Sequence, residues 1–264
     1  MTLRSLLSAA NRKILCSLHR RTVLLGDRGP IVSFTFDDFP RSAFLTGAPI
    51  LEAFGGRGTY YATASLMNTS DGLGDLFHIE DLHGLLGRGH ELGTQTFLHS
   101  SCRKASLADF QSDVHKGIRE LRRLVQHDSD NFCYPYGHVT LGTKRTLAPY
   151  LASARSIFPG INGPEVDLNL LRANSLYGEI AGSATVEELI AANLQQKGWL
   201  VFYTHDVRPN PSAYGCTPKL FEFAVSSAAR SGSRILTVAQ VLEEIGGNGQ
   251  VMAPPPESEV LVHA

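Results

Sequence analysis

Residues 31–38 read IVSFTFDD, an apolar run of strand length that ends in two adjacent carboxylates. Similar runs follow along the chain, with helical patterns between them. They are GTYYAT at 58–63, HELGTQ at 90–95, WLVFYTH at 199–205 and RILTV at 234–238. This alternation is typical of βα units, which build a parallel sheet. Seven or eight such units would close as a distorted β/α barrel, and the Gly-rich phosphate loop of an open doubly wound sheet does not follow the first strand.

Apolar residues at helical spacing predict five helices. They span residues 43–54, 79–86, 107–126, 186–196 and 218–229, with Ser106 as the N-cap of the third. We therefore expect one barrel domain over residues 30–245. A basic amphipathic segment, 1–29, precedes it, and a flexible tail rich in Gly and Pro, 246–264, follows it.

The composition is that of an ordinary globular chain, with 43% apolar and 19% charged residues. A formal net charge of −1 provides no field that would attract nucleic acid, so no nucleic-acid partner is expected. The four cysteines never form C-x-x-C, which indicates free thiols rather than a zinc knuckle.

The first 21 residues bear on where the protein acts. No apolar run is long enough to cross a bilayer, and polar residues interrupt any secretion signal, so a cytoplasmic location is expected. Residues 3–21 nevertheless combine basic side chains with apolar ones at helical spacing. These are Leu3, Leu6, Leu7, Ala10, Ile14 and Leu18. Either the segment touches a membrane surface peripherally, or it lies as a helix against the barrel, which is the favoured alternative.

Reactive groups of a parallel barrel gather at the carboxyl ends of its strands, which makes Asp37 and Asp38 the first candidates. Adjacent carboxylates repel each other unless they share a cation or a proton. One of them could hold a metal while the other acts as a base. The alternative is structural, with Asp38 or Ser42 capping the helix that follows.

Three further clusters end predicted strands. Gln95 and His99 stand four residues apart in GTQTFLH, close enough to face one ion. FCYPYG places Tyr136 in a turn that can present backbone N–H groups to an oxyanion. FYTHD puts His205 where it could act as an acid. A single histidine is more often a hydrogen-bonded structural residue, so each cluster is weak without the others.

In this order, TFDD (35–38), GTQTFLH (93–99), FCYPYG (132–137) and YTHD (203–206) resemble the polysaccharide deacetylase family, the carbohydrate esterases of family 4 related to nodulation chitooligosaccharide deacetylases. The resemblance covers roughly residues 30–240. It implies a distorted barrel and metal-assisted hydrolysis of an N-acetyl group on a carbohydrate. The expected substrate contains N-acetylglucosamine, as an oligosaccharide or a polysaccharide-synthesis intermediate.

Carried over by position, the resemblance makes Asp37 the general base, His205 the general acid and the Tyr136 N–H an oxyanion donor. Asp38, Gln95 and His99 take the positions of metal ligands, with zinc expected and cobalt or nickel as alternatives. Strand residues beside such a site usually form its apolar floor. We therefore expect three of them to receive the acetyl methyl group: Leu200, Phe202 and Leu236.

Two positions depart from the family pattern. Gln95 stands where a His is usual, and an amide oxygen is a poorer zinc ligand than imidazole, so metal affinity should fall. Cys133 stands where many members carry an Arg that orients the base carboxylate. Without that Arg, Asp37 would depend on its metal-bound neighbour.

The departures leave a second reading open, a catalytically weakened protein that binds a glycan or a biosynthetic partner. A barrel glycosidase is a third reading, but it needs two acids on different strand ends, which adjacent Asp37 and Asp38 do not provide. The turn-rich segment 208–218 is either a substrate-facing loop or a long connection, and the former is preferred.

Overall fold

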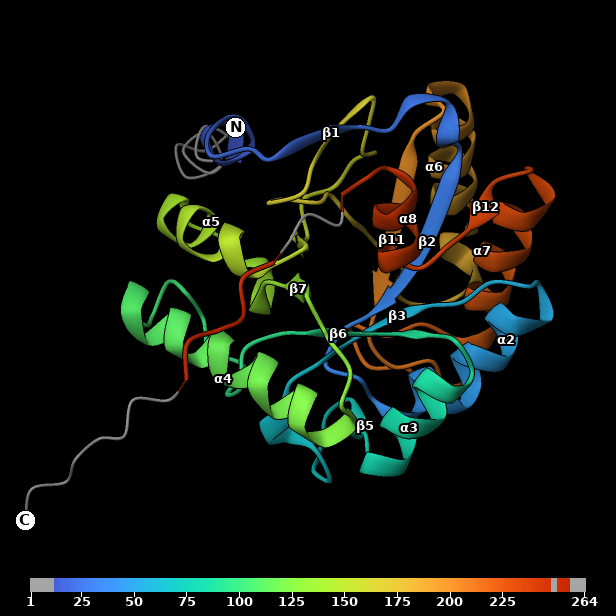
Figure 1. Ribbon diagram of the computed structural model, residues 1–264. Coiled ribbons are helices and arrows are strands. Elements are labelled where there is room, and N and C mark those ends of the chain that lie inside the picture. The colour runs from blue at the N-terminus through green and yellow to red at the C-terminus, as the bar shows by residue number, and fades with distance from the viewer. Residues whose placement is uncertain (1–11, 248–250, 257–264) are drawn as a thin grey trace, which may run out of the picture.

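The computed structural model describes residues 12–247 and 251–256, and an eight-stranded parallel sheet forms its centre (Figure 1). In spatial order the strands are β10 (Asn174–Ser175), β11 (Trp199–Thr204), β2 (Ile31–Phe36), β3 (Thr59–Ala62), β6 (Glu91–Thr94), β7 (Asn131–Cys133) and β8 (Ser153–Arg155), with β12 (Arg234–Ile235) also paired to β2. Every pairing in this sheet is parallel. The prediction of a distorted α/β barrel with seven or eight parallel strands is therefore confirmed.

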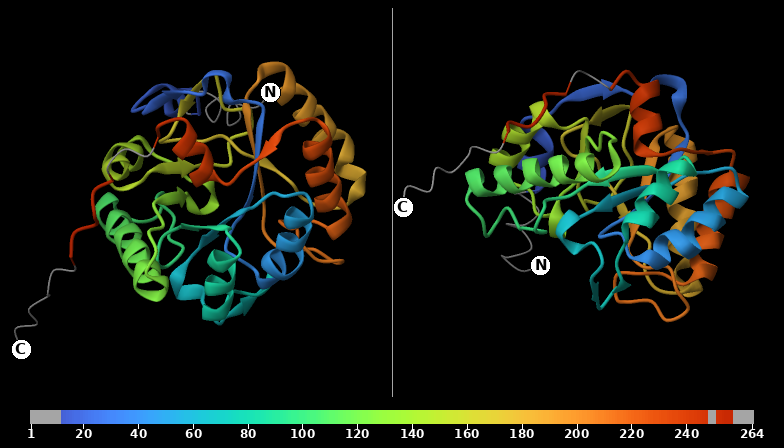
Figure 2. Two further views of the ribbon diagram at one scale, coloured as in Figure 1. Left: turned by 45° about the vertical axis from the view of Figure 1, so that its right-hand side comes forward. Right: turned by 60° about the horizontal axis from the view of Figure 1, so that its bottom comes forward.

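Helices cover the outside of the sheet, as the views in Figure 2 show. They are α2 (Ala48–Ala53), preceded by a π-helical turn (Ala43–Gly47), α3 (Ile79–Gly87), α4 (Leu107–Val125), α5 (Leu141–Leu147), α6 (Ser183–Gln196), α7 (Pro218–Arg230) and α8 (Val238–Glu244). All five predicted helices are present, and Ser106 Oγ caps α4 by accepting a bond from the Asp109 N–H. The short helices α5 and α8 were not predicted, because seven residues make too few turns for a clear apolar period.

Side chains along β2 and β11 point alternately to the two faces of the sheet and so contribute to two separate apolar layers. Phe34 and Phe202 stack outside the sheet with ring centroids 5.6 Å apart, and Phe221 of α7 meets Phe34 edge-on at 5.5 Å. Val201 and Tyr203, the sequence neighbours of Phe202, belong to a separate apolar cluster on the other face, together with Trp199. Side chains of a strand point alternately to its two faces, so even-numbered residues of β11 pack against helices and odd-numbered ones face the barrel interior.

Helix α8 closes the end of the barrel at which the strands begin. Its first N–H groups, of Val238 and Ala239, donate to Thr59 Oγ1 at 3.0 Å and to Glu91 Oε2 at 2.8 Å. Thr59 and Glu91 are the first residues of β3 and β6. With this end covered, the opposite end, at the carboxyl termini of the strands, is the one available for a site.

Two short antiparallel pairs lie outside the main sheet: β1 (Thr22–Leu24) with β9 (Glu165–Asp167), and β4 (Ser70–Asp71) with β5 (Gly74–Asp75). Residues 12–17 are helical. The buried ammonium of Lys144 donates to the Leu15 and Leu18 carbonyls at 2.8 and 2.9 Å and so joins this segment to α5. The favoured prediction, a helix against the barrel, therefore holds for residues 12–17, whereas residues 1–11 and 257–264 lie outside the described residues.

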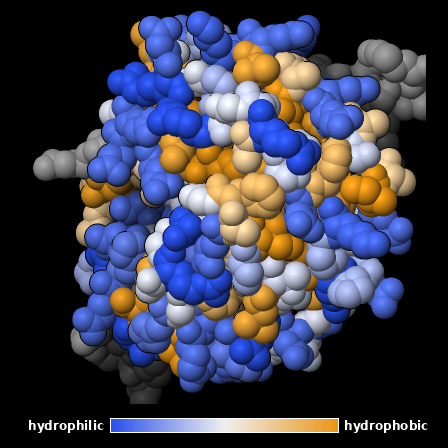
Figure 3. All heavy atoms as spheres, turned by 90° about the vertical axis from the view of Figure 1, so that its right-hand side faces the viewer, coloured by the Kyte–Doolittle hydropathy of each residue, from blue (hydrophilic) through white to orange (hydrophobic). Residues whose placement is uncertain are grey.

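The outer surface over α2, α6 and α7 carries scattered apolar side chains among polar ones (Figure 3). Exposed examples are Phe54, Ile180 and Leu194. Scattered apolar side chains are normal on a helix layer that faces solvent. None of the helices in the described chain is long and apolar enough to span a membrane.

Candidate active site

A cavity of about 970 Å³ opens at the carboxyl ends of the strands. Its lining contains all six polar residues that the sequence placed there: Asp37, Asp38, Gln95, His99, Tyr136 and His205. They come from the ends of β2 and β11 and from the turns after β6 and β7. The predicted site residues thus meet in one cavity, as parallel strand ends require.

Asp38 is the centre of this group. Its Oδ1 lies 3.1 Å from His99 Nε2 and accepts a bond of 2.9 Å from Gln95 Nε2, and its Oδ2 lies 3.7 Å from His205 Nε2. Burial raises the pKa of Asp38, but the hydrogen bond and charge of His99 and the charge of His205 outweigh it and leave the pKa lowered. The pKa of His99 is raised, because its bond to Asp38 outweighs its burial.

The backbone is held in an unusual form at the same residues. Asp38, Phe39, His99 and Tyr136 all have positive φ, at 60°, 49°, 56° and 59°. The left-handed region is costly for residues other than glycine and persists where surrounding packing enforces it. Phe39 supplies such packing, since its buried ring stacks on Phe77 with centroids 5.3 Å apart.

Asp37 is paired with an arginine that the sequence analysis missed. Arg155, fully buried on β8, forms an ion pair with Asp37 Oδ1, and its Nη2 also lies 2.7 Å from Cys133 Sγ. Burial would lower the pKa of Arg155, but the charge of Asp37 outweighs it and raises the pKa. The expectation that Asp37 lacks a guanidinium is therefore wrong, because β8 supplies one where β7 has Cys133.

Two tyrosine rings enclose the Arg155 guanidinium. Its Cζ lies 5.1 Å from the ring centroids of both Tyr61 and Tyr203, within the range of cation–π contacts. The one signal in the sequence was a basic residue among small ones in a short segment, SARS at 153–156. A charged residue inside a strand is costly unless it is paired, so it could have been marked as functional.

His205 is oriented by the segment that follows it. Its Nδ1 lies 3.1 Å from the Tyr214 carbonyl, which leaves Nε2 facing the cavity. The buried Asp206 carboxylate holds this loop by accepting bonds from the Ser212 N–H at 2.8 Å and from Ser212 Oγ at 2.5 Å. Ser212 and Tyr214 line the cavity, so segment 208–218 is the cavity-facing loop that was preferred.

Aromatic side chains form much of the remaining wall. Tyr177 lies 5.5 Å from Tyr203 and 6.1 Å from Tyr214, measured between ring centroids, and Tyr136 lies 4.6 Å from His99. Tyr136 sits in the turn Pro135–Gly137, closed by a bond of 2.9 Å from the Gly137 N–H to the Tyr134 carbonyl. The sequence analysis did not place Tyr177, Tyr203 or Tyr214 here, because no local pattern tells which tyrosines face the barrel interior.

The predicted apolar floor is not part of the cavity. Leu200 and Phe202 are buried in the layer between the sheet and the helices, and Leu236 packs against the cluster around Trp199. None of the three lines the cavity. For Leu200 and Phe202 the assignment took the wrong face of β11, where adjacent residues point to opposite sides and the inward one is Tyr203.

The resemblance implies a divalent cation, and the donors around Asp38 fit one. Asp38 Oδ1 and His99 Nε2 are 3.1 Å apart, the spacing of two ligands that each lie about 2.1 Å from a shared ion. The side-chain amide of Gln95 would be the third ligand, beside the Asp38 carboxylate and the His99 imidazole. No group of three His, Cys, Asp or Glu suited to a metal occurs among the described residues, so the amide would have to complete the set.

Comparisons with known proteins agree with this fold. Residues 26–150 match the family model described as polysaccharide deacetylase, which confirms the resemblance. No curated protein sequence matches the chain. Among solved structures, the chain is similar to a family 4 acetyl xylan esterase from Clostridium thermocellum, at 16% identity and a TM-score of 0.58 over 86% of this chain and 95% of that chain.

Two further structures are similar. One is the Xyl-CE4 domain of a multidomain xylanase from the hindgut metagenome of Trinervitermes trinervoides, at 15% identity and a TM-score of 0.55, covering 87% of this chain and 96% of that chain. The other is a mutant of the peptidoglycan deacetylase PdaC from Bacillus subtilis, at 14% identity and a TM-score of 0.51, covering 83% and 93%. At these identities the likeness establishes the fold.

Proposed function

We propose that this protein, with its polysaccharide deacetylase fold and family match, hydrolyses acetyl groups on a carbohydrate. The observation that carries the proposal is the convergence of His99, Gln95 and His205 on Asp38, within 3.1, 2.9 and 3.7 Å, beside Asp37 and its arginine partner. A carboxylate base, an imidazole acid and a cation-binding set in one cavity are the groups that such a hydrolysis needs.

The proposed substrate is an N-acetylated sugar chain, such as an N-acetylglucosamine oligosaccharide or a polysaccharide-synthesis intermediate. Tyr136 and Tyr214 support this proposal, because both rings are 58% exposed at the cavity and can stack on the apolar face of a sugar. The similar structures include an acetyl xylan esterase and a peptidoglycan deacetylase, so relatives of this fold act on both ester and amide.

In the proposed mechanism Asp37 accepts the proton of the attacking water, and Arg155 keeps that carboxylate oriented in the cavity. The Tyr136 N–H would stabilise the oxyanion that forms on the acetyl carbonyl. His205 would then protonate the departing amine from Nε2, since its Nδ1 is engaged with the Tyr214 carbonyl.

Asp38, His99 and Gln95 are the proposed ligands of a divalent cation, zinc first and cobalt or nickel as alternatives. When bound, the cation would supply Lewis acidity toward the water and the acetyl carbonyl. The similar Clostridium thermocellum esterase was solved with a cobalt ion. Gln95 offers a neutral oxygen, so affinity should be lower than with three charged or imidazole donors.

One contact favours the second candidate, a weakened deacetylase-like protein that binds a glycan or a biosynthetic partner. Gln95 turns its amide nitrogen, not its oxygen, toward Asp38, at 2.9 Å. In this orientation the amide neutralises part of the Asp38 charge by donation and does not act as a ligand. As a ligand, the Gln95 amide would present Oε1 to the ion.

The test combines two measurements on the purified full chain. Elemental analysis gives bound metal per chain, and acetate release is followed from N-acetylglucosamine oligomers with added zinc, cobalt or nickel. About one equivalent of metal, with acetate release abolished in Asp37→Asn, would support a working deacetylase. Folded protein with neither metal nor acetate release would support the binding protein instead.

Two expectations about location stay predictions. They are a cytoplasmic location and a peripheral contact of residues 3–21 with a membrane surface, of which residues 3–11 lie outside the described residues.

A further inference from the structure

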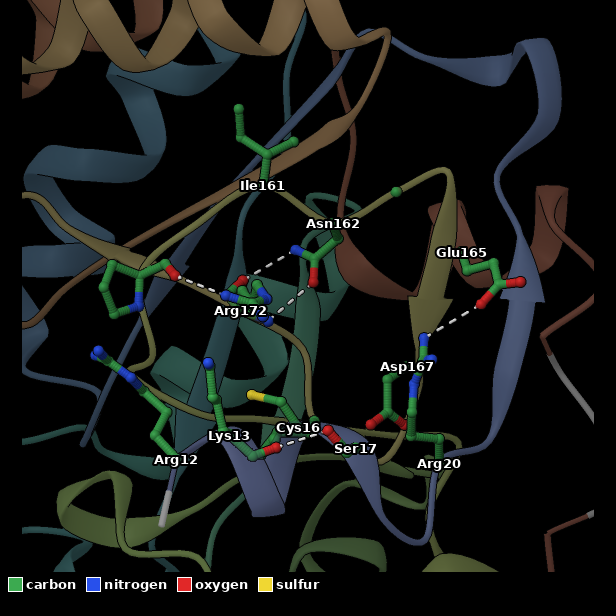
Figure 4. Close-up of a pocket in the computed structure, with 13 residues that line it drawn as sticks. Arg12, Lys13, Cys16, Ser17, Arg20, Ile161, Asn162, Glu165, Asp167 and Arg172 are labelled. Atoms are coloured by element: carbon green, nitrogen blue, oxygen red, sulfur yellow. Dashed lines mark hydrogen bonds and ion pairs between the residues drawn. The ribbon is translucent and has the colours of Figure 1, made fainter. Parts of the chain in front are cut away.

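A second cavity, of about 690 Å³, shares no lining residue with the active site. Its walls are residues 12–20, at the start of the described chain, and segment 159–172, between β8 and β10. Figure 4 shows Arg12 and Lys13 extending from the first wall toward the second, which carries Arg172. Basic side chains from two distant parts of the sequence thus line one hollow.

The charges of this cavity do not balance. Among the described residues, four basic and two acidic side chains line it, and both acids already have partners. Asp167 Oδ2 lies 2.8 Å from Lys144 Nζ, and Glu165 Oε2 lies 3.5 Å from Arg20 Nη2. Within the described part of the chain, the basic residues of the cavity left without a carboxylate partner are Arg12, Lys13 and Arg172.

The first wall is held rigidly. Lys144, 1% exposed, donates to the Leu15 and Leu18 carbonyls, and Asn169, 6% exposed, donates to the His19 carbonyl at 2.9 Å. Arg12 and Lys13 therefore project from a backbone that is tied to the barrel at three carbonyls. A basic segment lying loosely on the surface would not need such buried donors.

The second wall is held by one buried amide. Asn162, 5% exposed, accepts a bond of 2.9 Å from the Arg172 N–H and donates to the Arg172 carbonyl at 3.0 Å. The guanidinium itself donates to the Pro159 carbonyl at 3.2 Å. Arg172 is thus positioned, by contacts that leave part of its guanidinium available to a ligand.

We propose that this cavity binds a phosphate-bearing small molecule, of the pyrophosphate or sugar phosphate class, between Arg12, Lys13 and Arg172. Like charges lining one cavity repel each other unless an anion lies between them. Three cations match a multivalent phosphate better than a carboxylate, which carries a single charge. Guanidinium groups bind phosphate oxygens in pairs, and an ammonium adds a point charge.

The size of the cavity favours a molecule over a bare ion. Small-molecule sites usually have volumes of about 300–1,000 Å³ and mix apolar walls with a few polar anchors. Here Pro159, Ile161 and Leu170 provide apolar lining beside the cations. The site is independent of the proposed deacetylase activity, because no residue is common to the two cavities.

The test is calorimetric titration of the full-length protein at low salt with inorganic pyrophosphate, with glucose 6-phosphate and with glucose. We expect saturable binding of the two phosphate compounds, weakened by added salt, and none of glucose. Lys13→Gln and Arg172→Gln should each weaken binding about tenfold or more, as for loss of one charge-assisted bond. The control is Arg230→Gln, at the exposed end of α7, which removes one charge outside the cavity and should change Kd less than twofold.

Three results would overturn the proposal. One is equal weakening by Arg230→Gln, since binding would then follow net charge alone. Another is no saturable binding of either phosphate compound to folded protein. The third is sedimentation with vesicles containing anionic phospholipid, lost in Lys13→Gln, without binding of the soluble phosphates, which would assign these cations to a membrane surface.

Discussion

The guanidinium of Arg155, on β8, and the carboxylate of Asp37, at the end of β2, form a buried ion pair beneath the active-site cavity. Cys133, on β7 next to β8, stands beside them, with its sulfur 3.8 Å from Asp37 Oδ2. In the sheet, β3, β6 and β7 separate β8 from β2, so the arginine reaches Asp37 across the barrel interior.

Arg155→Gln should lower kcat/KM for acetate release about 100-fold or more, because a displaced base no longer meets the attacking water. Removing one partner of a buried pair should also lower the free energy of unfolding by about 3–5 kcal/mol. Arg155→Lys, which keeps the charge without the planar fork, covers the case in which the first variant does not fold. Arg20→Gln, at an exposed pair, is the control, and unchanged kcat/KM in folded Arg155→Gln would contradict the assigned role.

Gln95→His should raise both the metal bound per chain and the turnover number, because imidazole is a better zinc ligand than an amide. The measurement is elemental analysis after equilibration with a fixed zinc concentration, followed by an assay of the same sample. Gln95→Leu is the matched control and should lose metal. If Gln95→His gains neither metal nor turnover, the metal site is not what limits activity.

His205→Asn should lower kcat by about 10²–10⁴-fold, the usual contribution of a general acid, with little change in bound metal. We expect kcat to fall without loss of metal because His205 Nε2 lies 3.7 Å from Asp38, farther than His99 Nε2 at 3.1 Å. Metal content and kcat are measured on the same preparation. Parallel loss of metal and activity would make His205 a ligand instead of an acid.

Phe202→Ala and Tyr203→Phe test which face of β11 meets the substrate. Phe202 is buried against the Phe34 ring, so its truncation should lower the free energy of unfolding by about 3–5 kcal/mol and leave KM unchanged. Tyr203 lines the cavity, so loss of its hydroxyl should change KM with little effect on stability. Denaturant unfolding and steady-state kinetics separate the two, and a KM effect confined to Phe202→Ala would restore the original floor assignment.

Glu52 should make stability depend on pH. The bidentate Arg88 pair, at 2.8 Å for both contacts, lowers the pKa of Glu52 to about 2 from a usual value near 4.5. A lowered carboxyl pKa stabilises the fold above the unfolded pKa, and this stability is lost as pH falls from about 5 toward 2. Because the pair is partly exposed, we expect about 1 kcal/mol.

The corresponding variant is Glu52→Gln, compared with wild type by urea unfolding at pH 7 and pH 3.5. The difference in unfolding free energy should be present at pH 7 and smaller at pH 3.5. Glu187→Gln, at an exposed position of α6, should show no such difference at either pH. A Glu52→Gln difference that stays constant between the two values would mean that the carboxylate charge does not stabilise the fold.

Much of the site could be read from the chain because the signals are local. A run such as IVSFTF identifies a buried strand by its apolar length, and the residues that follow it must lie at the carboxyl end. Asp37, Asp38 and His205 were therefore placed together correctly from strand ends alone. Gln95 and Tyr136 were placed near them for the same reason. Both follow predicted strands, and the carboxyl ends of parallel strands lie at the same end of the barrel.

Other features depended on contacts between distant segments. β8 has three residues, Ser153–Arg155, too few for a periodic pattern, so Arg155 was not recognised as the partner of Asp37. The cavity formed by residues 12–20 and 159–172 likewise exists only because two segments far apart in the sequence lie side by side. Pairing of this kind is set by packing across the whole barrel, so neither segment alone shows which partner it meets.

The sequence by itself determined the parallel α/β barrel and the six polar residues at one end of it, because strand length, strand ends and helical periodicity are properties of neighbouring residues. Only the tertiary structure decided that Tyr203 and not Phe202 lines the cavity, and that Arg155 pairs with Asp37 beside Cys133. Those outcomes depend on which face of a strand points inward and on which strands lie near each other. Both are determined by the twist, register and closure of the complete sheet.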